Sequence, residues 1–323
     1  MQNKKEILYH PIKKKIILIT GQHQSGKSFL NKIVCSLEKS NISIIDYFLE
    51  DLFKFYKFNK INKKVFNSLI NLYFNHYLIN KNLGRYLNFR PLDEGSIFVA
   101  DKKKISNIIK DLISEPSKKN LIKKIKKNNE IIVQLHNALH CIDLIFSSFK
   151  QVKVINVINN PIDQILSIYN KHKFFGDPNY GRAMLAAESK YLYNKKIFSE
   201  HAEGLENSFF KLNRLQKILH SKKRKDFLDK KNIKLIQKFN KKNFLKINYE
   251  DFFDKKKKIL EKISKFIKKK ITTKSTDIFK SKEYNLRKKE ILNRHKKEKF
   301  LLKNLNNNDK KILKKIIKDY ENL

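Results

Sequence analysis

The chain of 323 residues has few of the residues that make sharp turns or covalent cross-links. It contains 7 glycines, 5 prolines, 2 cysteines and no tryptophan. Cys35 and Cys141 lie far apart and show no metal-type spacing, so we expect neither a disulfide framework nor a zinc site. No apolar run approaches the roughly 18 residues that a membrane-spanning helix needs, and the basic start does not resemble a signal peptide. We therefore expect a soluble, cytoplasmic protein.

Acidic residues are also scarce, with 31 Asp and Glu against 73 Lys and Arg and a formal net charge of +42. An excess of this size is compatible with a nucleic-acid-binding protein. Only 7 of the basic residues are arginine, however, and lysine runs such as 255–258 are typical of solvated helix faces. A lysine-rich composition of this kind fits the codon bias of an A/T-rich gene, and we expect no specific nucleic-acid partner.

Short apolar runs alternate with helical patterns along the chain, which is the signature of an α/β protein. The sequence predicts a three-layer P-loop fold with a central parallel sheet of about five strands and helical insertions at about 49–127 and 175–237. Residues 1–275 would form the main domain and 276–323 a basic helical tail. The expected strands are 15–20, 42–45, 131–135, 153–158 and 244–247, and the first, third and fourth of them are nearly continuous Ile, Val and Leu.

Two of the few glycines frame a motif of the form G-x4-G-K-[ST]. It lies directly after the first expected strand and opens an amphipathic helix that continues with Phe29. In that position the backbone N–H groups, the helix N-terminus and Lys27 can surround a phosphate group. The residues of this glycine loop are Gly21, Gln22, His23, Gln24, Ser25, Gly26, Lys27 and Ser28.

The glycine loop alone does not decide the chemistry. A kinase or NTPase would place Ser28 on Mg²⁺ and would need a carboxylate at the end of a neighbouring strand. The third and fourth expected strands end without one. Asp46, after the second strand, is the best candidate, and Glu250 and Asp251 are more remote ones.

Four segments together resemble the sulfotransferases that use 3′-phosphoadenosine 5′-phosphosulfate. They are similar, in order, to a phosphosulfate-binding loop, a strand ending near a histidine, an R-x-P-x-D-x-x-x-S motif for the 3′-phosphate, and a strand followed by YED. The resemblance covers about residues 13–270. The matching segments are Gln24–Ser28, Gln134–His136, Asn159–Ser167 and Tyr249–Asp251.

The resemblance implies a sulfuryl transfer from 3′-phosphoadenosine 5′-phosphosulfate to a hydroxyl, or less readily an amine, of a carbohydrate, lipid or small molecule. His136 would be the general base and Lys27 would stabilise the leaving oxygen, with no metal needed. Two residues depart from the family pattern, because Gln24 replaces a basic residue and Asn159 replaces the arginine of the 3′-phosphate motif. The expected nucleotide-binding residues are Gly21 to Ser28, Phe29, Asn159, Ser167, Tyr249, Arg287 and Lys288.

Two other hypotheses remain open at this stage. The first is a P-loop kinase or NTPase that uses Mg·ATP, with Lys27, Ser28 and Asp46 at its site. The second is a basic nucleic-acid-binding protein with a vestigial glycine loop. His136 also has a purely structural interpretation as a core histidine.

Overall fold

The central sheet is parallel and has five strands in the order β2-β3-β1-β4-β7. The computed structural model describes residues 12–91, 93–100, 102–113, 117–171 and 190–322. The predicted strand number and type are confirmed, and each predicted strand end is correct to within one residue. The strands are β1 (Lys15–Gly21), β2 (Ser43–Ile45), β3 (Glu130–His136), β4 (Val152–Ile158) and β7 (Phe244–Asn248).

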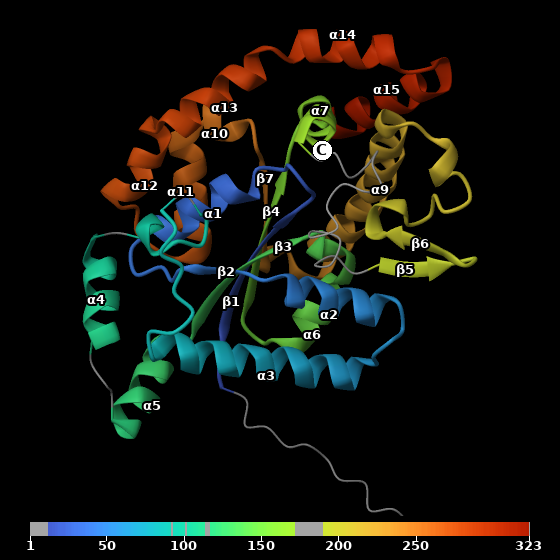
Figure 1. The fold of residues 1–323 in the computed structure, drawn as a ribbon. Coiled ribbons are helices and arrows are strands. Elements are labelled where there is room, and N and C mark those ends of the chain that lie inside the picture. The colour runs from blue at the N-terminus through green and yellow to red at the C-terminus, as the bar shows by residue number, and fades with distance from the viewer. Residues whose placement is uncertain (1–11, 92, 101, 114–116, 172–189, 323) are drawn as a thin grey trace, which may run out of the picture.

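Helices cover both faces of this sheet, as predicted for a three-layer fold (Figure 1). Successive side chains of a strand point to opposite faces, so in β1 Ile16 and Leu18 enter one apolar cluster while Ile17 and Ile19 enter the other. The first cluster is completed by α2 (Tyr47–Lys57), α3 (Lys63–Asn82), α6 (Ile142–Ser148) and the end of α9 (Arg214–Asn240). The second is completed by α1 (Lys27–Ser36), α10 (Asp251–Asp254), α11 (Lys256–Ile267) and α13 (Lys282–Leu292).

A third apolar cluster attaches the C-terminal helices to the sheet domain. It joins α7 (Pro161–Lys171) and the first half of α9 to α14 (Arg294–Asn304) and α15 (Asn307–Glu321). Figure 1 shows α13 and α14 running over the molecule from α12 (Thr273–Asp277) towards α15. The residues that the sequence assigns to a tail therefore pack on the main domain. Within the described residues, no helix combines the length and apolarity needed to cross a membrane.

The two insertions differ from each other. The first contains α2 and α3, then α4 (Lys102–Ile113) and α5 (Lys118–Lys127), as its pattern predicts. In the second, where we expected helices, the described part begins with a two-stranded antiparallel hairpin, β5 (Lys190–Tyr193) and β6 (Lys196–Ser199). Asn194 and Lys195 both have positive φ, 47° and 62°, which is the backbone that a tight two-residue hairpin turn requires. The helical pattern holds only from Arg214 onward.

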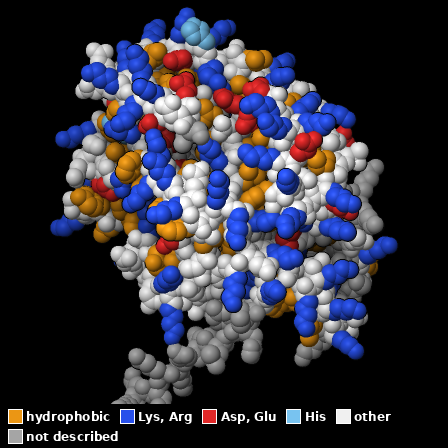
Figure 2. All heavy atoms as spheres, turned by 180° about the vertical axis from the view of Figure 1, so that it is seen from behind, with side chains coloured by type: hydrophobic (Ala, Val, Ile, Leu, Met, Phe, Trp, Pro, Cys, Tyr) orange, Lys and Arg blue, Asp and Glu red, His pale blue; other side chains and the backbone are white. Residues whose placement is uncertain are grey.

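The positive charge is spread over the surface. Figure 2 shows lysine and arginine side chains over the whole of one face, mixed with acidic and apolar ones rather than gathered in a single stripe. Lysines of α11 such as Lys257 and Lys262 are exposed, whereas Ile259 and Ile263 of the same helix are buried. This pattern agrees with the interpretation of the lysine runs as solvated helix faces.

Candidate active site at the carboxyl end of the sheet

The glycine loop lies at the carboxyl end of β1, the central strand. The neighbours of β1 are β3 on one side and β4 on the other, and ligands of open α/β sheets bind where the chain order reverses in this way. Gly26 has φ +97°, and a Cβ there would lie 2.1 Å from the Tyr249 ring. A Cβ on Gly21 would lie 2.4 Å from the Val157 carbonyl oxygen. Glycine is thus required at both positions for steric reasons.

Three residues from the end of β4 and from α7 hold the middle of the glycine loop. Asn159 Nδ2 donates to the Gln24 carbonyl at 3.0 Å, and Ser167 Oγ bonds to Gln24 Oε1 at 3.0 Å. Gln164 Nε2 donates to the His23 carbonyl at 2.5 Å. The segment expected to meet the 3′-phosphate is therefore adjacent to the segment expected to meet the 5′-phosphosulfate, although more than a hundred residues separate them.

Lys27 is an unusual cation because it is almost completely buried at the start of α1. Its side chain is 4% exposed and its Nζ donates to the Gln22 carbonyl at 2.6 Å. Burial lowers the pKa of Lys27 to about 7, and the negative charges of Glu50 and Glu94 oppose this effect only in part. A negatively charged ligand at the glycine loop would favour the protonated lysine.

His136 ends β3 and is fixed by a carboxylate from the first turn of α2. Glu50 Oε1 accepts a hydrogen bond from the His136 backbone N–H at 2.8 Å and lies 2.7 Å from its ring Nδ1. The imidazole also stacks on His23, with ring centroids 4.2 Å apart. A carboxylate at Nδ1 selects the tautomer in which Nε2 carries the lone pair. That arrangement is the one that a histidine base needs.

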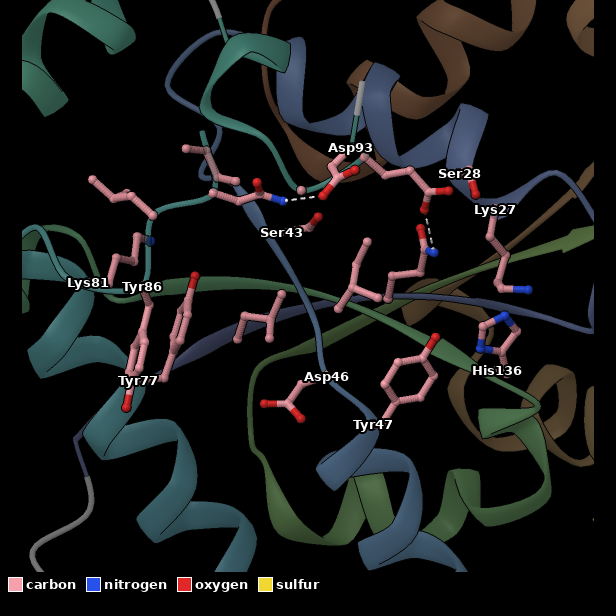
Figure 3. A pocket seen from close by; sticks show the side chains of 18 of the residues that line it. Lys27, Ser28, Ser43, Asp46, Tyr47, Tyr77, Lys81, Tyr86, Asp93 and His136 are labelled. Atoms are coloured by element: carbon pink, nitrogen blue, oxygen red, sulfur yellow. Dashed lines mark hydrogen bonds between the residues drawn. The ribbon is translucent and has the colours of Figure 1, made fainter. Parts of the chain in front are cut away.

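A cavity of about 1090 Å³ runs from the glycine loop along β2 to α3. Figure 3 shows Lys27 and His136 side by side at one end of it, with Tyr77, Tyr86 and Lys81 at the other. Of the predicted site residues, the structure brings to this cavity His23, Gln24, Ser25, Gly26, Lys27, Ser28, His136 and Arg287.

The remaining predicted residues do not line this cavity. Phe29 is 1% exposed and packs among the aromatic rings of Tyr249, Phe252 and Phe253. Tyr249 is buried against Gly26 and its hydroxyl accepts a hydrogen bond from Arg287 Nη1 at 3.2 Å. Gln22 and Asn159 line a second cavity. Lys288 is exposed, and it lines neither cavity. The same holds for Gly21 and Ser167, which line neither cavity.

Sequence reasoning missed several carboxylates of this site. Glu50 was not considered, although its helix begins directly after β2 and its first turn faces the carboxyl edge of the sheet. Asp226 and Asp229 of α9 were also missed; both accept from Gln22 Nε2, at 2.9 and 2.7 Å, beneath the glycine loop. Glu94 of the first insertion also lines the cavity, and it accepts a hydrogen bond from Gln134 Nε2 at 2.9 Å.

The acid that a kinase would require is already in use. Asp46 Oδ1 accepts from the Phe48 N–H at 2.8 Å and so caps α2, while its Oδ2 accepts from the Tyr73 hydroxyl. These are the contacts of a helix cap. The geometry therefore favours the group-transfer site around Lys27 and His136 over a Mg²⁺ site at Asp46.

A glycine loop at the end of a buried strand, with a lysine and a carboxylate-paired histidine beside it, is compatible with a group-transfer enzyme of the α/β class. The model of the sulfotransferase domain matches residues 14–323. The chain thus belongs to the sulfotransferase family, in agreement with the resemblance of its motifs. A search of curated proteins finds no match.

Solved sulfotransferase structures are only distantly similar to the chain. Sulfotransferase STF1 from Mycobacterium tuberculosis is 10% identical, with 84% of this chain and 72% of that one covered and a TM-score of 0.40. The sulfotransferase domain of the Synechococcus PCC 7002 olefin synthase is 10% identical, covering 87% and 83% with a TM-score of 0.41. The domain from the curacin biosynthetic pathway is 15% identical, covering 82% and 78% with a TM-score of 0.39. The family assignment rests on the domain match.

Proposed function

We propose that this sulfotransferase takes its sulfuryl group from 3′-phosphoadenosine 5′-phosphosulfate and passes it to a hydroxyl, or less readily an amine, of a carbohydrate, lipid or small molecule. The observation that carries the proposal is the meeting of Asn159, Ser167 and the glycine loop at Gln24. Both cysteines are buried and unpaired, which suits a reducing, cytoplasmic location.

The glycine loop has the chemistry to hold the phosphosulfate end of such a donor. Ser25 Oγ is buried and has no hydrogen-bond partner among the described residues, so its hydroxyl is able to donate to an anionic oxygen. The N-terminus of α1 begins at Lys27, and its unpaired N–H groups attract negative charge. The donor supplies an electrophilic sulfur and a stable leaving phosphate.

His136 acts as the base in this proposal. The acceptor oxygen forms a bond to sulfur while the bond from sulfur to the bridging phosphate oxygen breaks, and the acceptor proton passes to His136 Nε2. Glu50 holds the ring in the required tautomer and stabilises the imidazolium that forms. Lys27 and the loop N–H groups stabilise the charge that develops on the leaving oxygen. Because a sulfuryl group carries less charge than a phosphoryl group, the proposal needs no metal.

The donor proposal predicts a characteristic pattern of ligand stabilisation. Adenosine 3′,5′-bisphosphate should raise the melting temperature in the absence of Mg²⁺, and by more than ATP does with Mg²⁺, because a ligand that binds only the folded state stabilises it. Thermal unfolding with each nucleotide at equal concentration measures this. Stabilisation by Mg·ATP alone would instead return the kinase hypothesis to first place.

The contact between Glu50 and His136 predicts a second result. Glu50→Gln keeps the side-chain volume but removes the charge that stabilises the imidazolium, so kcat should fall about 10- to 100-fold. Donor affinity should change much less when it is measured at pH 6, because the Glu50 charge also raises the pKa of Lys27 and its loss affects that lysine most near and above pH 7. Asp51→Asn is the matched control, since Asp51 is on the same helix and its carboxylate faces Lys54 at 3.2 Å. Equal kcat values for the two variants would show that Glu50 has no positioning role. A shift in the pH profile of kcat for Glu50→Gln alone would separate positioning from general loss of structure.

A further inference from the structure

The segment that matches the 3′-phosphate motif has no cation at the position where the family motif has one, and it contacts Gln24, which lines the cavity. Asn159 is 7% exposed, and its Nδ2 already donates to the Gln24 carbonyl. Its Oδ1 has no hydrogen-bond partner among the residues described, and a carbonyl oxygen repels a phosphate. Ser167 offers one hydroxyl, which is bonded to Gln24 Oε1. These two residues cannot neutralise a doubly charged phosphate group by themselves.

Most of the cations in the cavity wall are placed or used elsewhere. Lys27 belongs to the glycine loop, and Lys81 lies at the opposite end, where it donates to the Glu130 carbonyl at 3.2 Å (Figure 3). Lys124 comes from α5, which packs on α3 at that same end. Arg287 is held by the Tyr249 hydroxyl and by Glu283 at 2.5 Å. Among the described residues, one further lysine lines the cavity, and it is Lys171.

The position of Lys171 on α7 matches this need. It lies four residues after Ser167, so the two side chains share one face of the helix. That face meets the glycine loop, because Ser167 bonds to Gln24 and Gln164 to the His23 carbonyl. The Lys171 side chain is exposed, lines the cavity with His23 and Gln24, and forms no ion pair with any residue that the structure describes.

We propose that Lys171 binds the 3′-phosphate of the donor and supplies the charge that is missing at Asn159. The inference rests on the proposed donor. Lysine provides a mobile point charge on a long flexible stem, so it can reach a phosphate from a helix turn beyond Ser167. The motif has then kept its serine, while its cation has moved from the position two residues before α7 to the last residue of that helix. A lysine in a last turn also stabilises the helix through its dipole, and the experiment has to separate these two roles.

Binding of two nucleotides to the wild type and to variants of Lys171 and Lys282 tests the proposal. Adenosine 3′,5′-bisphosphate and adenosine 5′-monophosphate, which differ by the 3′-phosphate, are titrated calorimetrically at fixed salt into the wild type and the variants. We expect Lys171→Gln to weaken bisphosphate binding about tenfold, the loss of one charged contact at an exposed site, and to leave monophosphate binding unchanged. Lys171→Arg should retain most of the affinity. Lys282→Gln removes an equal charge from an exposed position outside both cavities and should change neither.

Each possible result has a defined meaning. If the wild type prefers the bisphosphate and Lys171→Gln keeps that preference, or weakens both nucleotides equally, the role of Lys171 is wrong while the donor proposal stands. If the wild type does not distinguish the two nucleotides, the donor proposal itself fails. A lower melting temperature for Lys171→Gln with unchanged binding would assign Lys171 to helix stability alone. Recovery of the preference in the double variant N159R/K171Q would confirm that the charge is what matters.

Discussion

We expect His136→Ala to lower kcat by about 10²- to 10⁴-fold, the range that a positioned base contributes, while the affinity for adenosine 3′,5′-bisphosphate stays nearly unchanged. The reason is geometric. His136 ends β3 beside Lys27, and Glu50 fixes its ring nitrogen Nδ1 at 2.7 Å. The alanine variant keeps the glycine loop that holds the nucleotide but leaves no group to receive the acceptor proton. Single-turnover kinetics and calorimetric nucleotide binding measure the two effects separately.

Two further variants make the His136 result decisive. His136→Asn places an amide where it can still donate to Glu50 but cannot act as a base, so it should fold like the wild type and show the same loss of kcat. His295→Ala removes an exposed histidine of α14 that lines neither cavity and should be neutral. Wild-type turnover in a folded His136→Ala protein would exclude the base role, and Glu94, also in the cavity wall, would be tested next. If neither His136→Ala nor His136→Asn folded, His136 would be a structural residue.

The sequence was sufficient to predict the sheet and the place of the site because both depend on local signals. β1, β3 and β4 are buried on both faces, and such strands appear in the sequence as nearly continuous Ile, Val and Leu. Gly21 and Gly26 are conspicuous in a glycine-poor chain, and the pattern around them fixes a loop at a strand end. Parallel strands bring their carboxyl ends to one edge, so His136 and Asn159 were expected near the loop and lie there.

Contacts made by side chains across long sequence distances could not be predicted in the same way. Asp46 looked like a metal ligand in sequence, yet it caps α2 and binds Tyr73, because a short acid directly before a helix satisfies the free N–H groups there. The Tyr249 ring packs directly on Gly26 because Gly26 has no side chain. This contact is visible only in the folded chain. The hairpin at Asn194 was hidden because neither of its turn residues is glycine.

We also expect a large effect from Lys27→Met. At pH 6.5 this variant should bind adenosine 3′,5′-bisphosphate more weakly and its kcat should be lower by about 10²-fold or more. The reason is that a contact between a buried ammonium group and an oxygen of an anionic ligand is worth several kcal/mol. The wild type should also depend on pH in a specific way. The pKa of Lys27 is lowered to about 7 by burial, so the ammonium form prevails only below that value. Nucleotide affinity should be greatest below pH 7 and fall by up to about tenfold per pH unit above it. The methionine variant should lack this slope.

The stability of the wild-type protein should depend on pH in the opposite direction to its nucleotide affinity. This difference separates a binding role of Lys27 from a structural one. Because the folded-state pKa lies below the unfolded value, the unfolded chain binds more protons between about pH 7 and 10, and this lysine opposes folding most strongly below pH 7. Lys27→Met should therefore be at least as stable as the wild type at pH 6 while binding the nucleotide far more weakly. Lys14→Met is the matched control, because burial lowers the pKa of Lys14 to about 8 at the other end of β1. It should change stability with pH in the same direction and leave nucleotide binding intact. Wild-type affinity that stays flat from pH 6 to 9, or a Lys27→Met protein that binds normally, would remove Lys27 from the binding site.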